Sequence, residues 1–188
     1  MKRSFYNQHT EKVAKALLGC YLINKTKSGI AIGKIVETEA YLSNDPASHS
    51  YNGKTKRNEA MFGQAGTAYI YFTYGMHHCF NVVTRPKGIG EAVLIRSLEP
   101  ISGIELMKRR RKTDEVRQLC TGPAKLVQAL EISKKQNGID LINSSLKISN
   151  SKFNIKLPVI RTTRVGISKG TDLKLRFYIK DNNFVSKR

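Results

Sequence analysis

The alternation of apolar and polar residues along the chain predicts several short strands. Two are expected over Cys20–Asn24 and Gly29–Tyr41, and a third over Glu91–Ser97. The segment Thr67–Val83 is rich in aromatic and β-branched residues but is interrupted by Tyr74-Gly75. Because glycine readily adopts the positive φ of a tight turn, this segment predicts a β-hairpin with Tyr74 at its tip.

Apolar spacing combined with capping residues predicts the helices. One is expected over Phe5–Leu18, where Thr10 can act as a cap and the apolar stripe ends near Gly19. A second covers roughly Gly103–Arg111. A third begins with Pro123 at its first position, after a cap at residue 121 or 122.

The order of these elements predicts the fold class. A final pair of strands is expected near Arg164–Ile167 and Lys174–Ile179. Strands and helices follow one another without a βαβ rhythm, and neither an internal repeat nor a linker divides the chain. The predicted fold is therefore α+β: a single compact domain over residues 1–188, with a mostly antiparallel curved β-sheet, peripheral helices and a protruding β-hairpin.

Composition adds a strong positive charge to this picture. Lys and Arg number 33 against 14 Asp and Glu, which gives a formal net charge of +19. Such an excess favours a polyanionic partner, since each neutralised phosphate releases counterions, although a basic protein without such a partner is the alternative. A membrane-surface role would need bulky apolar anchors, which the basic run Lys108–Lys112 lacks, and no apolar run approaches a membrane span.

The cysteines bear on compartment and metal binding. Cys20, Cys79 and Cys120 are widely spaced and form no C-x-x-C pair, which favours a reducing, intracellular compartment: cytoplasmic, and nucleoid-associated if bacterial. Consecutive strand residues point to opposite faces, so His77, His78 and Cys79 cannot converge on one metal ion. We expect neither a metal nor an organic cofactor, and we expect a monomer because no apolar interface stripe is evident.

The first candidate for chemistry is the stretch Val36–Tyr41. On a strand, Glu37, Glu39 and Tyr41 share one face. Two carboxylates together are unusual in a chain with 14 acidic residues, although both could simply pair with surface lysine or arginine. The apolar strand that ends at Arg96 places a guanidinium where it is poorly solvated and requires a carboxylate partner. The spacing leaves open which glutamate that partner is.

Aromatic residues form the second candidate. Flipped bases are held between aromatic faces, and Tyr41, Tyr69 and Tyr71 are interleaved with basic loops. Tyr69 and Tyr71 share a face of their strand, where core packing is the more common role. Tyr74 differs, because a bulky ring at an exposed hairpin tip can act as a wedge in the minor groove. His49, in a polar loop, is either a surface residue or a hydrogen-bond donor near a phosphodiester or leaving base.

Long blocks of sequence extend these local patterns. They are VETEAYLSNDPASHS, KRNEAMFGQAGTAYIYFTYGMHHCFNVV, AVLIRSLEPISGIELM, LCTGPAKLVQAL, and RVGIS with LRFYI. In this order, and over nearly the whole chain, they resemble the alkyladenine (3-methyladenine) DNA glycosylase family. The resemblance is specific because the matching strings are long and contiguous.

This resemblance implies a monofunctional enzyme of base-excision repair. It would flip alkylated or deaminated purines (3-methyladenine, 7-methylguanine, hypoxanthine, etheno-adenine) out of double-stranded DNA and hydrolyse the N-glycosidic bond, which leaves an abasic site. Glu39 would be the general base that activates the water attacking C1′ of the sugar, and Arg96 would help to hold that water. Tyr74 would be the intercalating wedge.

The resemblance also implies the residues of the base pocket. Tyr41 and Tyr71 would sandwich the flipped base between their rings. His49 would close the pocket and contact the base or its phosphate. Asn81 would reject the amino group of normal guanine.

Phosphate contacts are expected at Gly122 and Lys125, since backbone N–H groups at a helix N-terminus favour anions, and at Arg57. The sequence departs from the family pattern at Ser43, where the family has glycine, and at Lys56, which replaces a proline. Both changes affect the polar loop after the second strand. They therefore bear on substrate range more than on activity.

Three other functions compete with this one. A non-enzymatic DNA- or RNA-binding module would explain the charge and the exposed tyrosines, but not Glu39 with Arg96. A base deaminase would need the H-x-E and P-C-x-x-C zinc signature, which is missing, and a metal-dependent nuclease would need several clustered acids. Lyase activity would need an amine nucleophile, which the abundant lysines could supply but the resemblance argues against.

Overall fold

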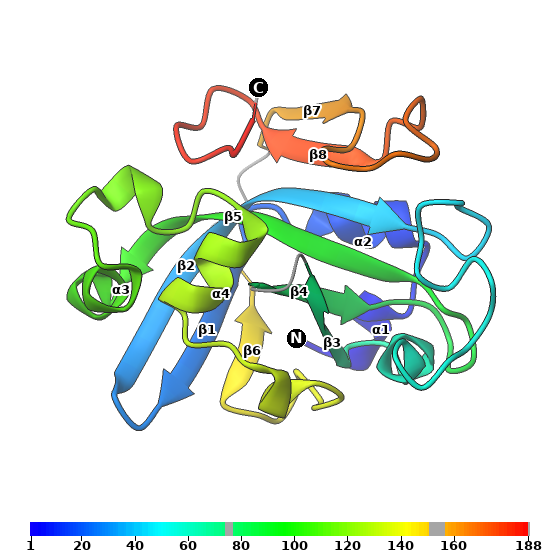
Figure 1. Ribbon diagram of the computed structural model, residues 1–188, viewed down its shortest axis with the longest axis horizontal. Helices are drawn as coiled ribbons and strands as arrows, with labels where there is room; N and C mark the ends of the chain where they lie inside the picture. The colour runs from blue at the N-terminus through cyan, green and yellow to red at the C-terminus, as the bar shows by residue number, and fades with distance from the viewer. Residues whose placement is uncertain (74–76, 151–156, 188) are drawn as a thin grey trace.

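The computed structural model describes residues 1–73, 77–150 and 157–187 (Figure 1). Its strands are β1 (Tyr21–Thr26), β2 (Gly29–Tyr41), β3 (Ala68–Thr73), β4 (His77–Val83), β5 (Ala92–Ser102), β6 (Leu146–Ser149), β7 (Val159–Thr162) and β8 (Arg176–Ile179). Every strand pair in these ranges is antiparallel. The sheet runs in the order β3-β4-β5-β2-β1-β6 and curls into a half-barrel, while β8 pairs with β2 and β7.

Strand β2 is the long central strand of the sheet. β5 pairs along one side of it, whereas the other side is shared by β1, which pairs with Gly29–Lys34, and β8, which pairs with Glu37–Glu39. The predicted strand over Gly29–Tyr41 is confirmed to the residue. Because three strands hold β2, the carboxylates near its end project from a rigid backbone.

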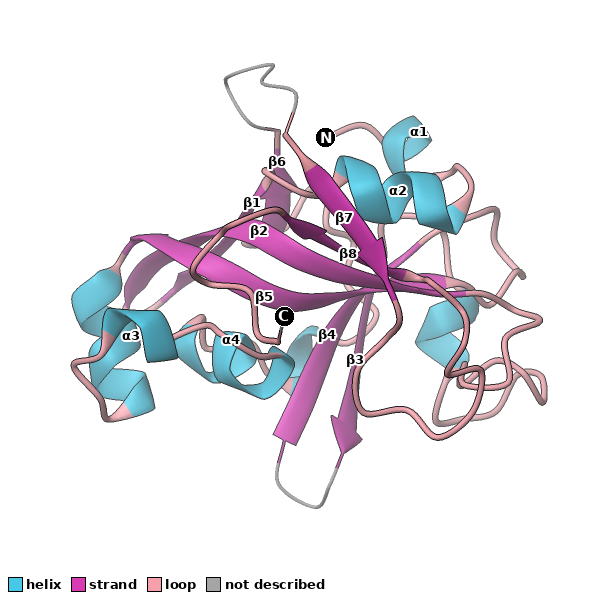
Figure 2. Ribbon diagram, turned by 90° about the horizontal axis from the view of Figure 1, so that it is seen from above, coloured by secondary structure: helices cyan, strands magenta, loops and turns pink. Residues whose placement is uncertain are grey.

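Helices cover both faces of this sheet. They are α1 (Arg3–Tyr6), α2 (Thr10–Ala16), α3 (Ile104–Arg111) and α4 (Pro123–Ala129), with short 3-10 turns η1 (Glu59–Phe62), η2 (Val116–Gln118) and η3 (Lys134–Gln136). Figure 2 shows α2 on one side of β2 and β5, and α3 and α4 on the other. The Thr38 hydroxyl donates to the Ala14 carbonyl of α2 over 2.9 Å, so the neighbouring Glu37 and Glu39 face away from α2.

A small apolar cluster lies apart from the main core. It comprises Met61, Tyr69, Val83 and Ala92, with Tyr41, Ala60, Phe62 and Tyr71 packed against it. The rings at the base of the β3–β4 hairpin therefore rest on apolar side chains. No helix in the described ranges is long and apolar enough to cross a membrane.

The first helix departs from the prediction of one element over Phe5–Leu18. The chain leaves helical geometry at Asn7, and the Gln8 side chain donates to two carbonyls of α1 that a longer helix would use. Thr10 does not cap α2, because its hydroxyl hydrogen-bonds to that of Thr84, 2.7 Å away. The segment is thus helical as predicted, but it forms two short helices and not one.

The strand predicted over Arg164–Ile167 is wrong, since that segment is a loop and β7 is the partner of β8. Arg164 is buried in an ion pair with Asp45, and the N–H of Val165 donates to Glu39 instead of to a neighbouring strand. These tertiary contacts replace the hydrogen bonds of a ladder.

Strand β6 and the second half of β5 have no counterpart among the predicted elements. The hairpin, the β8 strand and α4 beginning at Pro123 are confirmed.

Candidate active site

One pocket collects most of the predicted site residues. It has a volume of about 540 Å³, and its lining comes from β2–β5, the loop after β2, the loop 165–169 and the start of α4. The lining residues are Tyr41, Pro46, Ala47, Ser48, His49, Met61, Tyr69, Tyr71, Cys79, Asn81, Leu94, Arg96, Pro123, Val165, Gly166, Ile167, Ser168 and Lys169. The four predicted base-pocket residues and Arg96 are among them. Glu39 is not, but its carboxylate accepts hydrogen bonds from two lining residues, Tyr41 and Val165.

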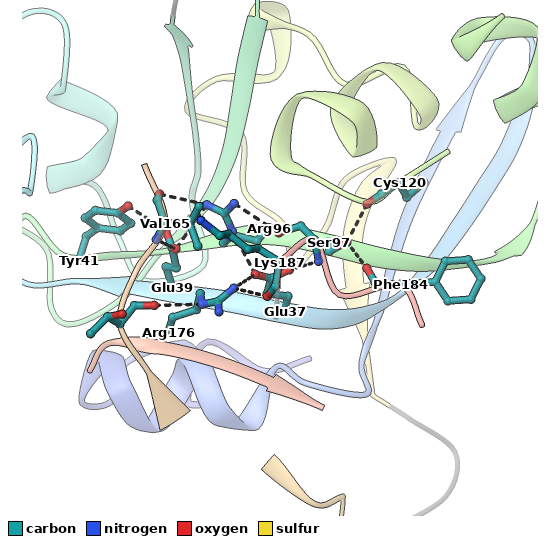
Figure 3. A network of polar contacts seen from close by, with 12 residues as sticks. Glu37, Glu39, Tyr41, Arg96, Ser97, Cys120, Val165, Arg176, Phe184 and Lys187 are labelled. Carbon is teal, nitrogen blue, oxygen red and sulfur yellow. Dashed lines mark hydrogen bonds and ion pairs between the residues drawn. The ribbon is translucent and has the colours of Figure 1, made fainter. Parts of the chain in front are cut away.

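A bulge brings the two glutamates and the arginine together. The register between β2 and β5 shifts between Glu37 and Thr38, which leaves Arg96 as an extra residue on β5. Such a bulge re-aims a side chain, and bulges are common beside active sites. The side chain of Arg96 lies across the face of β2 that carries Glu37 and Glu39 (Figure 3).

Arg96 binds both carboxylates. Its Nε lies 3.2 Å from Oε1 of Glu37, and its Nη1 lies 3.3 Å from Oε1 of Glu39. Both glutamates are fully buried, and Arg96 is 8% exposed. The sequence left open which glutamate is the partner of Arg96. Both are, because each one contacts a different nitrogen of the same guanidinium.

Glu39 receives two further hydrogen bonds. The backbone N–H of Val165 donates to Oε1 over 2.9 Å, and the Tyr41 hydroxyl donates to Oε2 over 2.9 Å. Burial raises the pKa of Glu39, because the charge of Arg96 and these two donors offset only part of the lost solvation. A carboxylate whose pKa is raised is a better proton acceptor than an ordinary glutamate once it is ionised.

Glu37 lies in a more strongly cationic setting. Arg176 Nη1 donates to Oε1 over 2.7 Å beside Arg96, and the N–H of Ser186 donates to Oε2 over 2.7 Å. Among these partners, Arg96 alone lines the pocket. Glu37 therefore holds Arg96 from the side away from the pocket.

Tyr41 lies between Glu39 and a second buried ion pair. The guanidinium of Arg164 stacks on its ring, 4.7 Å from the centroid, and Arg164 Nη2 donates to Asp45 Oδ1 over 2.9 Å. Burial raises the pKa of the Tyr41 hydroxyl, so this group stays protonated and donates to Glu39. Because Arg164 occupies one face of the ring, a stacked base can use only the other.

Strand β3 supplies two further tyrosines, and His49 packs against both. The rings of Tyr69 and Tyr71 lie 5.4 Å apart on one face of the strand, as predicted. The His49 ring lies 4.4 Å from that of Tyr71, and its Nδ1 lies 2.8 Å from the Tyr69 hydroxyl. Packing against these rings and the nearby charge of Arg57 lower the pKa of His49, so the imidazole is neutral at pH 7.

The remaining predicted residues lie in the lining, at its edge or beyond the described ranges. Asn81 is buried on β4, and its side-chain amide donates to the Tyr69 carbonyl over 3.1 Å. Gly122 directly precedes α4, and Lys125 lies in the first turn of that helix. Tyr74 falls among residues 74–76, outside the described residues.

Arg57 lies outside the pocket lining but close to it. Its side chain is exposed, and Nη2 reaches the Phe72 carbonyl at the end of β3, 3.4 Å away. Of the three predicted phosphate contacts, Arg57 thus lies in the loop before η1 and touches β3, whereas Gly122 and Lys125 lie at the start of α4.

Several residues of the site leave no signal in the sequence. The carbonyl of Val165 accepts a hydrogen bond from Arg96 Nη1 at 3.4 Å, so the backbone of this residue touches both Arg96 and Glu39. Asn58 fixes the loop of His49, because its amide donates to the His49 carbonyl over 2.7 Å. The Val165 contacts are made by backbone groups and do not depend on residue type, whereas the Asn58 side chain meets a backbone carbonyl nine positions away, which no local pattern reports. In the described part of the chain, no three His, Cys, Asp or Glu side chains are grouped to hold a metal ion.

Known proteins resemble the chain over almost its whole length. A family model described as Methylpurine-DNA glycosylase (MPG) matches residues 4–183. A protein of Francisella tularensis subsp. tularensis (strain SCHU S4 / Schu 4), named "Putative 3-methyladenine DNA glycosylase", is 57% identical over 183 residues, which cover 95% of this chain and 94% of the relative. Proteins of the same name from Carboxydothermus hydrogenoformans and Methanoculleus marisnigri are 53% and 50% identical; the matches cover 100% and 98% of this chain, and 99% and 97% of the relatives.

The pocket and these matches define an enzyme class, the DNA glycosylases, which are hydrolases of the bond between a base and its sugar. The chain belongs to the methylpurine-DNA glycosylase family. The resemblance inferred from the sequence blocks is thereby confirmed, and damaged DNA is the substrate that this family membership implies.

Proposed function

We propose that the pocket receives a damaged purine flipped out of duplex DNA and that Glu39 is the general base that hydrolyses its N-glycosidic bond. The observation that carries this proposal is a buried carboxylate with a raised pKa, in direct contact with the lining of a tyrosine-rich pocket. The net charge of +19 favours a polyanionic substrate. The product is an abasic site, the first intermediate of base-excision repair.

The chemical step needs one water molecule. Glu39 takes a proton from the water as its oxygen attacks C1′, while the bond to the base nitrogen breaks and its electron pair leaves with the purine. A carboxylate has about four lone-pair positions, and the hydrogen bonds from Val165 and Tyr41 use one on each oxygen, while Arg96 forms an ion pair with Oε1, so Glu39 keeps acceptor capacity for the water. The charge of Glu39 also stabilises the oxocarbenium-like sugar.

The state of His49 bears on which bases leave fastest. Alkylated purines such as 3-methyladenine and 7-methylguanine are cationic and leave without further protonation. Hypoxanthine and etheno-adenine are neutral, and their departure is helped by an acid. Because the pKa of His49 is lowered, it supplies a hydrogen bond but not a full proton at neutral pH. We therefore propose that the enzyme releases cationic lesions faster than neutral ones.

The walls of the pocket account for base selection. Tyr41 offers one ring face to a stacked base, since Arg164 covers the other, and Tyr71 supplies the second aromatic surface. Asn81 is held in one orientation by its hydrogen bond to the Tyr69 carbonyl. A fixed amide at this position would reject the amino group of guanine.

Contacts with the duplex are assigned to the edges of the site. We propose that Tyr74, which the sequence predicts at the hairpin tip, is the wedge that fills the gap left by the flipped base. Arg57, Lys125 and the backbone N–H of Gly122 are the proposed phosphate contacts. Each neutralised phosphate contributes to a salt-dependent affinity that does not depend on sequence.

A DNA-binding module without catalytic activity is the competing function. It accounts for the charge and for the aromatic rings, but it assigns no role to Glu39. An ionisable group that is buried with a raised pKa costs stability at neutral pH, and such groups cluster at functional sites. This cost favours the enzyme.

The test is base release from defined duplexes in the presence of a metal chelator. Labelled duplexes with one hypoxanthine or etheno-adenine, and globally methylated DNA, are incubated with the protein, and strand breaks are scored before and after hot alkali. Breaks only after alkali, together with free damaged purine, are expected. Binding without base release from any of these substrates would overturn the proposal. Breaks before alkali would indicate a lyase, for which Lys169 in the pocket lining is the amine to replace.

A further inference from the structure

The segment 184–187 contacts the residues that hold Arg96. The hydroxyl of Ser186 accepts a hydrogen bond from Arg96 Nη2 at 3.3 Å, while the N–H of Ser186 donates to Glu37 Oε2 over 2.7 Å. The carbonyl of Lys187 accepts from Arg176 Nη1 at 2.8 Å. Figure 3 shows this segment beside the two arginines. One short stretch of chain thus binds the catalytic guanidinium, its carboxylate partner and the second arginine.

The segment is fixed against the sheet. The Ser97 hydroxyl on β5 contacts the Phe184 carbonyl and that of Cys120, and the side chain of Val185 is buried. Just before it, the Asn182 amide donates to Glu99 Oε2 over 3.0 Å. Terminal stretches of a domain are poorly ordered unless such contacts hold them. The position of Ser186 is therefore defined by packing.

Ser186 completes the set of acceptors around the guanidinium of Arg96. Nε is directed to Glu37, and Nη1 is directed to Glu39 and to the Val165 carbonyl. Ser186 supplies the acceptor at Nη2. Each directed nitrogen restricts the orientation of a planar guanidinium further. Without the hydroxyl, the group can tilt about its bond to Glu37, which moves Nη1 relative to Glu39.

We infer that Ser186 is a positioning residue for Arg96 and that the segment 184–187 is part of the active site. The inference rests on the proposed catalytic roles of Glu39 and Arg96. The family model ends at residue 183, before this segment.

The pH dependence of the reaction reports on this positioning. The charged or titratable groups that act on Glu39 are Glu37, Tyr41, Tyr71, Cys79, Arg96 and Arg164. The charge of Arg96 is the leading influence that lowers the pKa of Glu39. If Arg96 tilts away, that pKa rises further, so base release fails at a higher pH as the solution is acidified. A purely structural role for Ser186 would not move this acid limb.

The test compares Ser186→Ala with the wild-type protein in single-turnover base release across a pH series. We expect the rate constant to fall about 10-fold, as for loss of a hydrogen bond to a charged group, and the acid limb to move to higher pH. Ser186→Thr keeps the hydroxyl and should restore both. Ser145→Ala, at an exposed serine before β6, is the matched control and should behave as wild type.

Two outcomes would overturn the inference. One is a Ser186→Ala protein with the wild-type rate and acid limb; the other is a slow Ser186→Ala protein whose acid limb is unchanged and whose rate Ser186→Thr does not restore. The carboxyl carbon of Glu39, titrated by NMR without DNA, provides a second readout that requires no activity. An upward pKa shift in Ser186→Ala would support the positioning role even if the wild-type protein released no base. An unchanged pKa there would contradict it.

Discussion

Glu37 and Glu39 lie on the same face of β2, are both fully buried and share Arg96, yet their surroundings differ. Glu37 also binds Arg176 and a backbone N–H of the segment 184–187, on the side away from the pocket. Glu39 contacts only the Arg96 guanidinium, which it shares with Glu37, and accepts hydrogen bonds from a backbone N–H and a tyrosine hydroxyl. Its pKa is raised. The same residue type in nearly the same place thus faces two guanidinium groups in one case and one in the other.

The role of a carboxylate therefore depends on its environment more than on its residue type. A carboxylate enclosed by two guanidinium groups is a structural anchor. One that is incompletely compensated, and adjacent to a pocket, is available for proton transfer. Substitutions at the two glutamates and at the residues around them test this difference.

The largest effect is expected from Glu39→Gln. Removing the base should slow single-turnover base release by roughly 10²–10⁴-fold or more, while binding to damaged duplex persists. The folded protein should be at least as stable as wild type at neutral pH. The reason is that the pKa of Glu39 is raised on folding, so the ionised form costs stability once the pH exceeds that pKa. Normal base release by this variant, measured by rapid quench, would remove Glu39 from the mechanism.

Glu37→Gln is expected to act mainly on stability. It leaves Arg176 and Arg96 without their shared anion, and loss of one partner from a buried pair costs about 3–5 kcal/mol. Urea unfolding would measure the loss. Glu99→Gln is the control, because Glu99 pairs with Lys34 at 2.7 Å with both side chains about a quarter exposed, where about 0–1 kcal/mol is expected. Equal effects of the two variants would contradict the anchoring role of Glu37.

Tyr41→Phe should move the pH profile. The substitution keeps a ring for stacking but removes the hydroxyl that donates to Glu39 and helps to lower its pKa. The acid limb of base release should therefore shift to higher pH, with a rate loss of up to about 10-fold on that limb. Tyr51→Phe, at an exposed tyrosine, is the matched control. An acid limb that stays in place would mean that this hydrogen bond does not tune the base.

Arg57→Ala and Lys125→Ala should give the smallest effects. Each removes one proposed phosphate contact, so each should reduce the slope of log affinity against log salt by about 1 and weaken binding similarly for all sequences. Titration of a labelled duplex at several salt concentrations measures the slope. Lys12→Ala, on the α2 side of the sheet away from the pocket, should leave it unchanged. A change at Lys12 equal to that at Lys125 would locate the DNA elsewhere.

Local patterns predicted much of the fold. The alternation in Gly29–Tyr41, the aromatic hairpin and the proline that starts α4 each depend on nearby residues, and each prediction is confirmed. The predicted strand at Arg164–Ile167 failed because a buried ion pair with Asp45 and a backbone bond to Glu39 hold that segment. Such contacts join positions far apart in the chain, so no local pattern reports them.

For the site too, local patterns predicted some residues and missed those that depend on distant segments. The sequence predicted that Arg96 pairs with Glu37 or Glu39, because an arginine on an apolar strand requires a carboxylate. The spacing alone could not distinguish the two glutamates, and only the family resemblance pointed to Glu39, since the physical distinction depends on Arg176 and Val165 from distant segments. Ser186 carried no signal at all, because a serine near the end of a chain is ordinary until its neighbours are known.

The different roles of the two carboxylates are tested by comparing Glu37→Gln with Glu39→Gln, by urea unfolding and by single-turnover base release at saturating enzyme. We expect the two rankings to cross. Glu39→Gln should be the slower enzyme and the more stable protein, whereas Glu37→Gln should be the less stable protein and, per folded molecule, the faster enzyme. If one variant were worse in both measurements, the division between an anchoring and a catalytic carboxylate would be contradicted.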